Sequence, residues 1–461
     1  MRKSSVAVLV FASLFSGLLF FSCGQRTVSN DELISVVAIS RHGIRSQTSL
    51  LSTTNLNTLR PEGFPLWPAP ADVPGDLSTW GEENATRLGA WYREFYAAKG
   101  LMPAIGTCPA DGTVFVYADT IERTRVTAQG YIDGMFSADS TSDNCGIQVH
   151  HYDGLLDPYI LTIDTGKCSV VTATDQAAFY TAIGGSVAAL KNTYSAQLQT
   201  LQTVTNCCQP EACNKSSPPA SCLLADLPTT VSVNSKTGTV AFAGGTLFDV
   251  ADSVTEDFEL QYAQAMPETN CATTPGAQCV GWSAIPPGGL SDLTKLHVMN
   301  MDLTNRLPSV AAVNSTNLMW QLIGTMDQAL TGVSNPDMLA PVTSTFTLFV
   351  AHDDNVASIA GFLGGVTWKA KGFQQNDPGP AGALVFELHK IKSSGQLVVK
   401  LFYVIASLDQ MRNGTELSLQ TPPQHLSLAI PACGGAHSCP YDQFKAFITN
   451  NVRKDCIVTA P

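Results

Sequence analysis

The chain has 461 residues and a formal net charge of −12, with 38 acidic against 26 basic side chains. This length is enough to bury one large hydrophobic core or two smaller ones. The acidic balance disfavours nucleic acid and anionic membrane surfaces as partners, so we expect neither to bind.

The first 23 residues have the pattern of an export signal. Arg2 and Lys3 precede an apolar run over residues 6–21, and Ser22-Cys23-Gly24 follows it. We therefore assign residues 1–23 to a signal peptide that is absent from the mature chain. A cysteine after a small residue resembles a bacterial lipoprotein cleavage site, which would make Cys23 a lipid anchor. A plain cleaved signal peptide is the alternative.

The first predicted strand, residues 34–39, leads directly into Arg41-His42-Gly43-Ile44-Arg45. In open α/β sheets, ligands bind outside the carboxyl ends of the strands. The two guanidinium groups offer forked donors that match phosphate oxygens. Their positive charge also favours the neutral form of His42, which a nucleophile requires. Taken alone, the motif could equally be a solvated surface loop.

Further along the chain, a capping-box pattern at Thr79 predicts a helix that ends at Gly100. The next strand, residues 114–118, leads into Glu122-Arg123-Thr124. An arginine just past a strand end is again suited to an anion, so Arg123 is a candidate site residue. Arg125 is more typical of a solvated helix side chain.

Helical periodicity dominates the middle of the chain, interrupted by a loop rich in Cys, Pro and Ser at about 205–240. The predicted helices lie at 186–204, 250–265 and 293–330, and strands return at 346–351, 383–388 and 397–405. This order predicts an α/β domain made of residues 31–150 and 335–461. A mainly helical domain, residues 151–334, would be inserted between its halves, with the active site in the cleft.

The strand at 346–351 ends in His352-Asp353-Asp354-Asn355. One aspartate is enough to cap the helix that follows, which leaves the other for chemistry. A second carboxylate beside an acid can raise its pKa. Either Asp353 or Asp354 could be that cap.

Together, Arg41-His42-Gly43-Ile44-Arg45, Glu122-Arg123-Thr124 and His352-Asp353 resemble the motifs of the histidine acid phosphatases. Residues 374–388 and 410–419 resemble the bacterial phytases and the periplasmic glucose-1-phosphatases. The likeness covers nearly all of the chain after the first thirty residues. It implies a phosphoglycerate-mutase-like α/β domain with an inserted, mainly helical second domain.

The resemblance also implies a role for each site residue. His42 would attack phosphorus and form a phosphohistidine, and Asp353 would protonate the leaving oxygen. The phosphate oxygens would be bound by Arg41, Arg45, Arg123 and His352. We expect no cofactor, because arginines can replace a metal ion as the charge clamp and no cluster in the sequence has metal-ligand spacing.

Three positions depart from the family pattern. Gln47 stands where the family often has proline. Asp354, which we interpret as the cap of the helix that follows, stands where the family commonly has threonine or serine. Thr48-Ser49 stands where bacterial phytases tend to place a lysine. The missing cation predicts that monophosphorylated sugars or aryl phosphates serve at least as well as phytate. Arg306 of the helical part is a candidate to supply that charge from across the cleft.

The chain has 13 cysteines, and 12 remain once Cys23 is set aside, which is typical of an exported, disulfide-bonded chain. The resemblance implies the pairs Cys108–Cys145, Cys168–Cys456 and Cys433–Cys439. Cys271 and Cys279 look like a local loop staple. Two further bridges, of open connectivity, would join Cys207, Cys208, Cys213 and Cys222.

We therefore expect an exported histidine acid phosphatase that hydrolyses sugar, inositol or aryl phosphomonoesters. It would be a monomer, periplasmic, anchored to the outer membrane or secreted. A phosphoglycerate-mutase-like enzyme is one alternative, but export and disulfides count against it. A non-catalytic binder of phosphate ligands on the same fold is the other, although all the proposed reacting groups are present.

Overall fold

The computed structural model describes residues 30–48, 73–137, 144–205, 207–208, 222–266, 285–286 and 288–459. The predicted signal peptide, Cys23, Ser49, Cys213, Cys271 and Cys279 lie outside these residues.

A mixed sheet forms the centre of the fold, in the order β10-β8-β7-β1-β6-β2-β3, with β9 paired to β8. Its strands are β1 (Asp31–Arg41), β2 (Val114–Ala118), β3 (Val149–His151), β6 (Phe346–Ala351), β7 (Ala383–Ile391), β8 (Leu397–Ile405), β9 (Gln424–Leu428) and β10 (Cys439–Pro440). Strands β1, β6, β2 and β3 are parallel, whereas β7 and β8 run antiparallel to their neighbours. The α/β fold class is confirmed.

The register of the parallel strands positions the candidate site. Arg41 at the end of β1 is opposite Ala351 of β6, and Ala118 of β2 is opposite Val350. The carboxyl ends of β1, β6 and β2 therefore lie next to one another. Residues that follow these strands must meet at one edge of the sheet.

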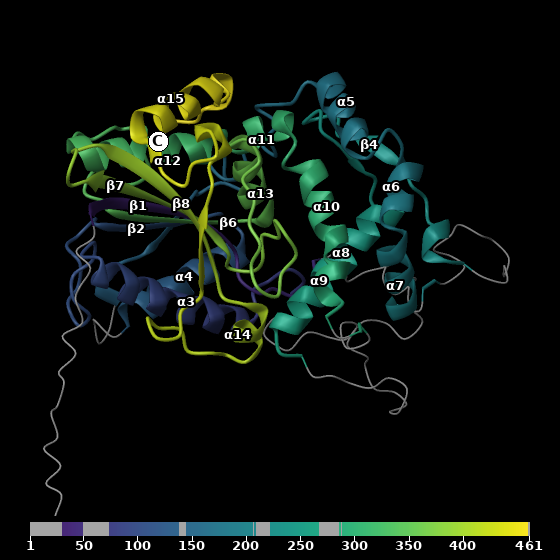
Figure 1. The fold of residues 1–461 in the computed structure, drawn as a ribbon, viewed down its shortest axis with the longest axis horizontal. Helices are drawn as coiled ribbons and strands as arrows, with labels where there is room; N and C mark the ends of the chain where they lie inside the picture. Colours follow the sequence, from purple (N-terminus) through teal and green to yellow (C-terminus); the bar gives the residue numbers. More distant parts are fainter. Residues whose placement is uncertain are drawn as a thin grey trace, which may run out of the picture.

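Helices cover both faces of the sheet (Figure 1). Helices α3 (Thr79–Ala98) and α4 (Glu122–Phe136) lie on one face, and α12 (Thr316–Thr331) and α15 (Tyr441–Asn451) lie on the other. The strands are buried from both sides, which explains why β1 contains the uninterrupted apolar run over residues 36–39. Helix α13 (Asp353–Phe362) begins directly after β6.

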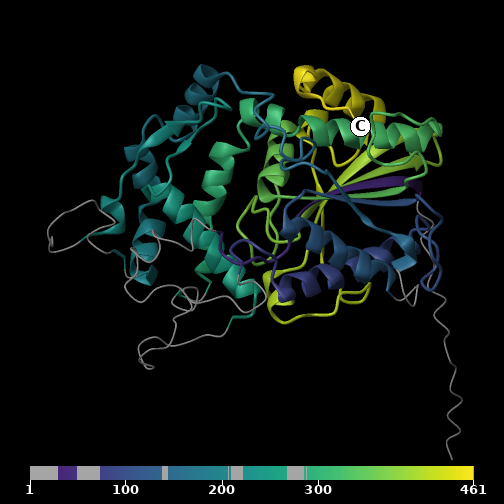
Figure 2. The same cartoon turned by 180° about the vertical axis from the view of Figure 1, so that it is seen from behind.

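A second group of helices lies beside the sheet, as both views show (Figures 1 and 2). It comprises α5 (Thr172–Ala182), α6 (Val187–Thr193), α7 (Ser195–Thr205), α8 (Leu247–Ala263), α9 (Leu290–Leu293), α10 (Lys295–Thr304) and α11 (Pro308–Asn314), with a hairpin of β4 (Val231–Val233) and β5 (Val240–Phe242). Its interior is a hydrophobic cluster separate from that of the sheet.

The boundaries of the inserted domain, residues 151–334, stay a prediction, and the position of α12 is relevant to the second boundary. The sequence places this helix in the inserted domain, but its Leu318, Met319 and Leu322 are part of the hydrophobic cluster around the sheet. The helical pattern predicted at 293–330 is divided among several helices, and Asn305 to Leu307 separate α10 from α11. Pro308 stands at the first position of α11, where its missing N–H costs nothing.

Short elements complete the described chain: α14 (Leu408–Arg412) and the 3₁₀ turns Asn144–Gly146, Leu224–Asp226, Pro431–Cys433 and Lys454–Cys456. The disulfides Cys108–Cys145, Cys168–Cys456 and Cys433–Cys439 are present as expected. The structure also pairs Cys207 with Cys208. Among the described helices, none combines the length and the apolar character needed to cross a membrane.

Candidate active site

The loop after β1 is held tightly between the sheet and α3. The amide of His42 donates to the carbonyl of Ala351 at 2.9 Å, and the carbonyl of His42 accepts from the amide of Ala381 at 2.9 Å. A Cβ on Gly81 would lie only 2.2 Å from the carbonyl oxygen of Ile44, so α3 can pack this closely only with glycine there. The backbone that carries Arg41, His42 and Arg45 is consequently fixed on two sides.

The side chain of His42 is oriented by its own loop. Its Nδ1 lies 2.9 Å from the carbonyl oxygen of Gly43, which can only accept, so Nδ1 carries the proton. Burial and the positive charges of Arg123, Arg41 and Arg45 hold the pKa of His42 well below its ordinary value. The imidazole is therefore neutral, and the lone pair on Nε2 is available to an electrophile.

Three guanidinium groups surround this imidazole from two segments, the β1 loop and the first turn of α4. Arg41 is fully buried, Arg45 is 6% exposed, and Arg123 is half-buried. The Nε atoms of all three are buried without a hydrogen-bond partner among the described residues. Buried donors without partners are uncommon, and they leave this cluster able to bind an oxyanion.

His352 joins the cluster from the end of β6. Its ring lies 5.6 Å from that of His42, centroid to centroid, and its Nδ1 is 3.4 Å from a terminal nitrogen of Arg123. On its other side, Nε2 bonds to a carboxylate oxygen of Asp119 at 2.7 Å. Asp119 follows β2 directly and is fully buried, so it fixes the orientation of the His352 ring.

Two carboxylates contact the arginines. Asp353 approaches Arg41 at 3.0 Å, and Glu256 of α8 contacts both Arg41 and Arg45. Burial alone would raise the pKa of Asp353, but Arg41 and the other basic groups around it together outweigh burial and hold that pKa well below its usual range. Burial likewise opposes ionisation of Glu256, and Arg45 and Arg41 more than offset it, so its pKa is lowered. Both carboxylates are ionised.

Asp354 contributes to the capping of α13 that the sequence predicts, because its carboxyl accepts from the backbone amide of Asn355. Asn355 accepts from the amide of His352, and Asp353 accepts from that of Asp354. The Oδ1 of Asp354 is buried without a partner among the described residues. Burial, with a smaller contribution from Asp353, raises the pKa of Asp354 to about 6.

Gln47 and Arg306, which the sequence analysis singled out, both bond to residues outside the arginine and histidine cluster. The side-chain amide of Gln47 donates to Asp257 of α8 at 3.1 Å, which ties the β1 loop to the helical part. Arg306 is held by Asp302 at 3.0 Å and by the carbonyl of Val366 at 2.7 Å. These partners take part of its hydrogen-bonding capacity, and a role of Arg306 in substrate binding stays a prediction.

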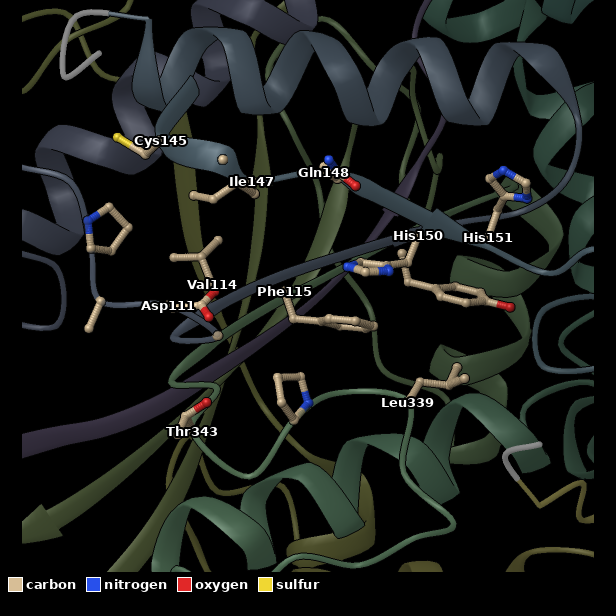
Figure 3. A pocket seen from close by; sticks show the side chains of 16 residues that line it. Asp111, Val114, Phe115, Cys145, Ile147, Gln148, His150, His151, Leu339 and Thr343 are labelled. Carbon is tan, nitrogen blue, oxygen red and sulfur yellow. The ribbon is translucent and has the colours of Figure 1, made fainter. Parts of the chain in front are cut away.

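A cavity of about 800 Å³ lies elsewhere, near the amino-terminal ends of β2 and β6. Figure 3 shows Phe115 and His150, from the neighbouring strands β2 and β3, with Leu339 and Thr343 across from them. None of the candidate site residues lines it. The arginine and histidine cluster is therefore a separate feature of the fold.

The structure thus brings together all six residues singled out in the sequence, Arg41, His42, Arg45, Arg123, His352 and Asp353. It adds Asp119 and Glu256, which sequence reasoning missed. Asp119 could have been noticed as an acid at the same strand end as Arg123. Glu256 carries no such signal, because it lies in an ordinary amphipathic helix.

The model of the histidine phosphatase superfamily (branch 2) matches residues 32–404, most of the chain. The protein belongs to this superfamily. Its relatives include phytase AppA of Escherichia coli, 32% identical over 93% of both chains. They also include a glucose-1-phosphatase of Salmonella typhimurium, 28% identical over 96% of this chain and 98% of that one.

Solved structures of bacterial phytases have a similar fold. The phytase of Hafnia alvei in complex with tartrate superposes with a TM-score of 0.79 at 28% identity, covering 94% of this chain and 100% of that one. The phytase of Citrobacter braakii gives a TM-score of 0.79 at 29% identity, covering 93% and 100%. The protein is accordingly a phosphomonoester hydrolase of the phytase and glucose-1-phosphatase type.

Proposed function

We propose that the protein is an exported histidine acid phosphatase in which His42 is the nucleophile and Asp353 the acid. One observation carries this proposal. Three guanidinium groups, those of Arg41, Arg45 and Arg123, lie around the neutral imidazole of His42. Such a cluster binds a phosphate dianion and stabilises the charge that spreads over its oxygens in the transition state. His352, held by Asp119, would donate to a further oxygen.

Substrate binding would begin with an exchange of anions. In the described structure, Glu256 takes the guanidinium donors of Arg41 and Arg45 that a phosphate would need. An incoming phosphate displaces this carboxylate and places its own negative charge beside Asp353. That charge weakens the hold of Arg41 on the ionised form and raises the pKa of Asp353, which can then carry a proton.

The chemical steps follow from this arrangement. His42 Nε2 attacks phosphorus, the bond to the ester oxygen breaks, and Asp353 gives its proton to that oxygen as the alcohol leaves. Water then attacks the phosphohistidine, Asp353 takes a proton from the water, and inorganic phosphate departs. A placed general acid contributes roughly 10²–10⁴-fold when the leaving group is an alkoxide.

The substrate belongs to the class of small phosphomonoesters. The relatives named above are a phytase and a glucose-1-phosphatase, so both an inositol polyphosphate and a sugar monophosphate are candidates. We favour sugar and aryl monophosphates, because Ser49 stands where bacterial phytases tend to carry lysine and because Arg306 is paired with Asp302. A substrate with several phosphates gains more from such cations than a monophosphate does.

Export is part of the proposal. An apolar run behind Arg2 and Lys3 supports it, as do the disulfides between segments far apart in the chain, such as Cys168–Cys456. We further propose that the chain acts as a monomer in the periplasm or beyond it, with Cys23 as a possible lipid attachment point.

Hydrolysis of p-nitrophenyl phosphate tests the proposed function. Wild-type protein should turn over this substrate in buffer without added metal, and His42→Ala should lose at least about 10³-fold in kcat. His437→Ala is the matched control, because His437 is exposed and lies outside the cluster. Absence of turnover by the folded wild type would favour a phosphate binder, and near-normal kcat for His42→Ala would overturn the mechanism.

A further inference from the structure

Three potential metal ligands from three separate elements meet beside Arg41. They are Glu256 of α8, His297 of α10 and Asp353 at the start of α13. One ligand atom from each, a ring nitrogen or a carboxylate oxygen, lies within 4.8 Å of the other two. No spacing in the sequence indicates this group, since helix packing brings Glu256 and His297 to Asp353.

His297 is oriented as metal-bound histidines usually are. Its Nδ1 bonds to Oδ1 of Asp252 at 2.8 Å, and the other oxygen of Asp252 accepts from Asn300 at 2.8 Å. The remaining ring nitrogen, Nε2, is buried and has no hydrogen-bond partner among the described residues. A carboxylate on one nitrogen, with the other left open, is the arrangement that fixes the ring of a metal ligand.

Ionisable groups of both signs surround the three ligands. The carboxylates in and around the group are those of Asp252, Glu256, Asp257, Glu259, Asp353 and Asp377, whereas the guanidiniums are those of Arg41, Arg45 and Arg123. Most of these side chains are buried. Although burial lowers it, the hydrogen bond and charge of Asp252 raise the pKa of His297 to about 9, so a bound cation would take the place of the proton on this imidazole.

We propose that Glu256, His297 and Asp353 form a binding site for Zn²⁺. Zn²⁺ takes both carboxylate oxygen and imidazole nitrogen as ligands, and water would complete the tetrahedron. Mg²⁺ and Ca²⁺ prefer oxygen ligands alone, so the imidazole favours zinc over them. Bonds of about 2.0–2.2 Å require the three side chains to close by roughly an ångström, which is within rotamer adjustment.

Zn²⁺ bound at this site would inhibit the phosphatase reaction. The bound ion would hold Asp353 and Glu256, so the first could not protonate a leaving group and the second could not swing away from its place. This consequence rests on the proposed function, whereas metal binding itself does not. Binding is therefore measured without substrate, and its outcome can be interpreted even if the proposed chemistry is wrong.

Isothermal titration of the metal-free, phosphate-free protein with ZnCl₂ at neutral pH tests the site. We expect one Zn²⁺ per chain in the tightest class and at least a tenfold weaker Kd in His297→Asn. His437→Asn, which removes an exposed imidazole, should leave that Kd unchanged. Equal Kd values in wild type and His297→Asn, or no binding by the wild type, would overturn the proposal.

A second measurement needs no variant, in case His297→Asn does not fold. X-ray absorption at the zinc edge of the wild-type complex should show only nitrogen and oxygen neighbours at about 2.0–2.2 Å, with the scattering of a single imidazole. Scattering from two imidazoles, or from sulfur, would place the ion elsewhere and contradict the assignment. With active enzyme, Zn²⁺ should also lower turnover of p-nitrophenyl phosphate reversibly, and EDTA should restore it.

Discussion

Glu256 lies against Arg45, with its two carboxylate oxygens 2.8 and 2.9 Å from one terminal guanidinium nitrogen. The pair joins α8 of the helical part to the loop after β1. A carboxylate and a phosphate present similar planar edges of oxygen to a guanidinium group. Glu256 therefore binds the guanidinium group that a phosphate substrate must bind. Phosphate affinity should depend on this carboxylate.

Replacement of Glu256 should strengthen phosphate binding. In Glu256→Gln the arginines no longer hold a competing anion, so we expect the inhibition constant of inorganic phosphate to fall roughly tenfold, about 1.4 kcal/mol. Steady-state inhibition against p-nitrophenyl phosphate measures it. Glu416→Gln is the control, because Glu416 also pairs with an arginine but is 86% exposed. An unchanged or higher constant in Glu256→Gln would show that this carboxylate does not compete with phosphate.

The role of Asp353 should appear in how much the reaction depends on the leaving group. Asp353→Asn should slow hydrolysis of an alkyl phosphate by about 10²–10⁴-fold, and that of p-nitrophenyl phosphate much less, because nitrophenolate leaves without a proton. Comparison of kcat/KM for the two substrates measures this. Asp354→Asn, at the neighbouring carboxyl, should affect both substrates alike. If Asp354→Asn showed the leaving-group dependence instead, the two aspartates would exchange roles.

Asp257 should make the fold less stable as pH rises. Burial raises its pKa to about 7, so between its ordinary value of 3.8 and about 7 the folded state holds a proton that the unfolded state releases. The contribution of Asp257 to the free energy of unfolding is therefore largest at acid pH. It should fall by roughly 2–3 kcal/mol from pH 5 to pH 7.

Asp257→Asn removes this titration while keeping an oxygen that can accept from Gln47. The variant should therefore gain stability relative to wild type as pH rises from 5 to 8, in urea unfolding at each pH. A difference between the two proteins that stays constant over this range would show that Asp257 does not titrate abnormally.

Substrate preference follows from the charges around the cluster. We expect kcat/KM for glucose 1-phosphate to equal or exceed that for phytate, and Ser49→Lys to shift the ratio toward phytate, mostly through KM. Ser49 lies outside the described residues, so this prediction rests on the sequence alone. Thr53→Lys, a few residues along the same segment, is a control for added charge. Strong preference of the wild type for phytate would contradict the prediction.

The sequence predicts the centre of the site well because its residues follow directly from strand ends. Arg41, His42, Arg123, His352 and Asp353 each come within a few residues of an apolar run that could only be a buried strand. Parallel pairing then forces those ends together, whatever the rest of the chain does. The family motifs add the roles, and the α/β class follows from the same strands.

Residues placed by helix packing could not be predicted in this way. Glu256 and His297 reach the site because α8 and α10 pack beside the sheet, and nothing local marks them as different from other helix residues. The start of α3 shows the limit of local signals as well. Its N-cap is Ser78, whose side chain accepts from Gly81, one residue before the predicted capping box at Thr79.

The central claim is that His42 carries the phosphoryl group, and trapping that intermediate tests it most directly. Wild-type enzyme mixed with a labelled phosphomonoester and quenched within milliseconds under alkaline conditions, which preserve phosphohistidine, should give one labelled peptide containing residues 41–45. Mass spectrometry should locate the phosphoryl group on His42, and His42→Ala should show no label. Label on any other residue, or full turnover without a labelled intermediate, would contradict the account.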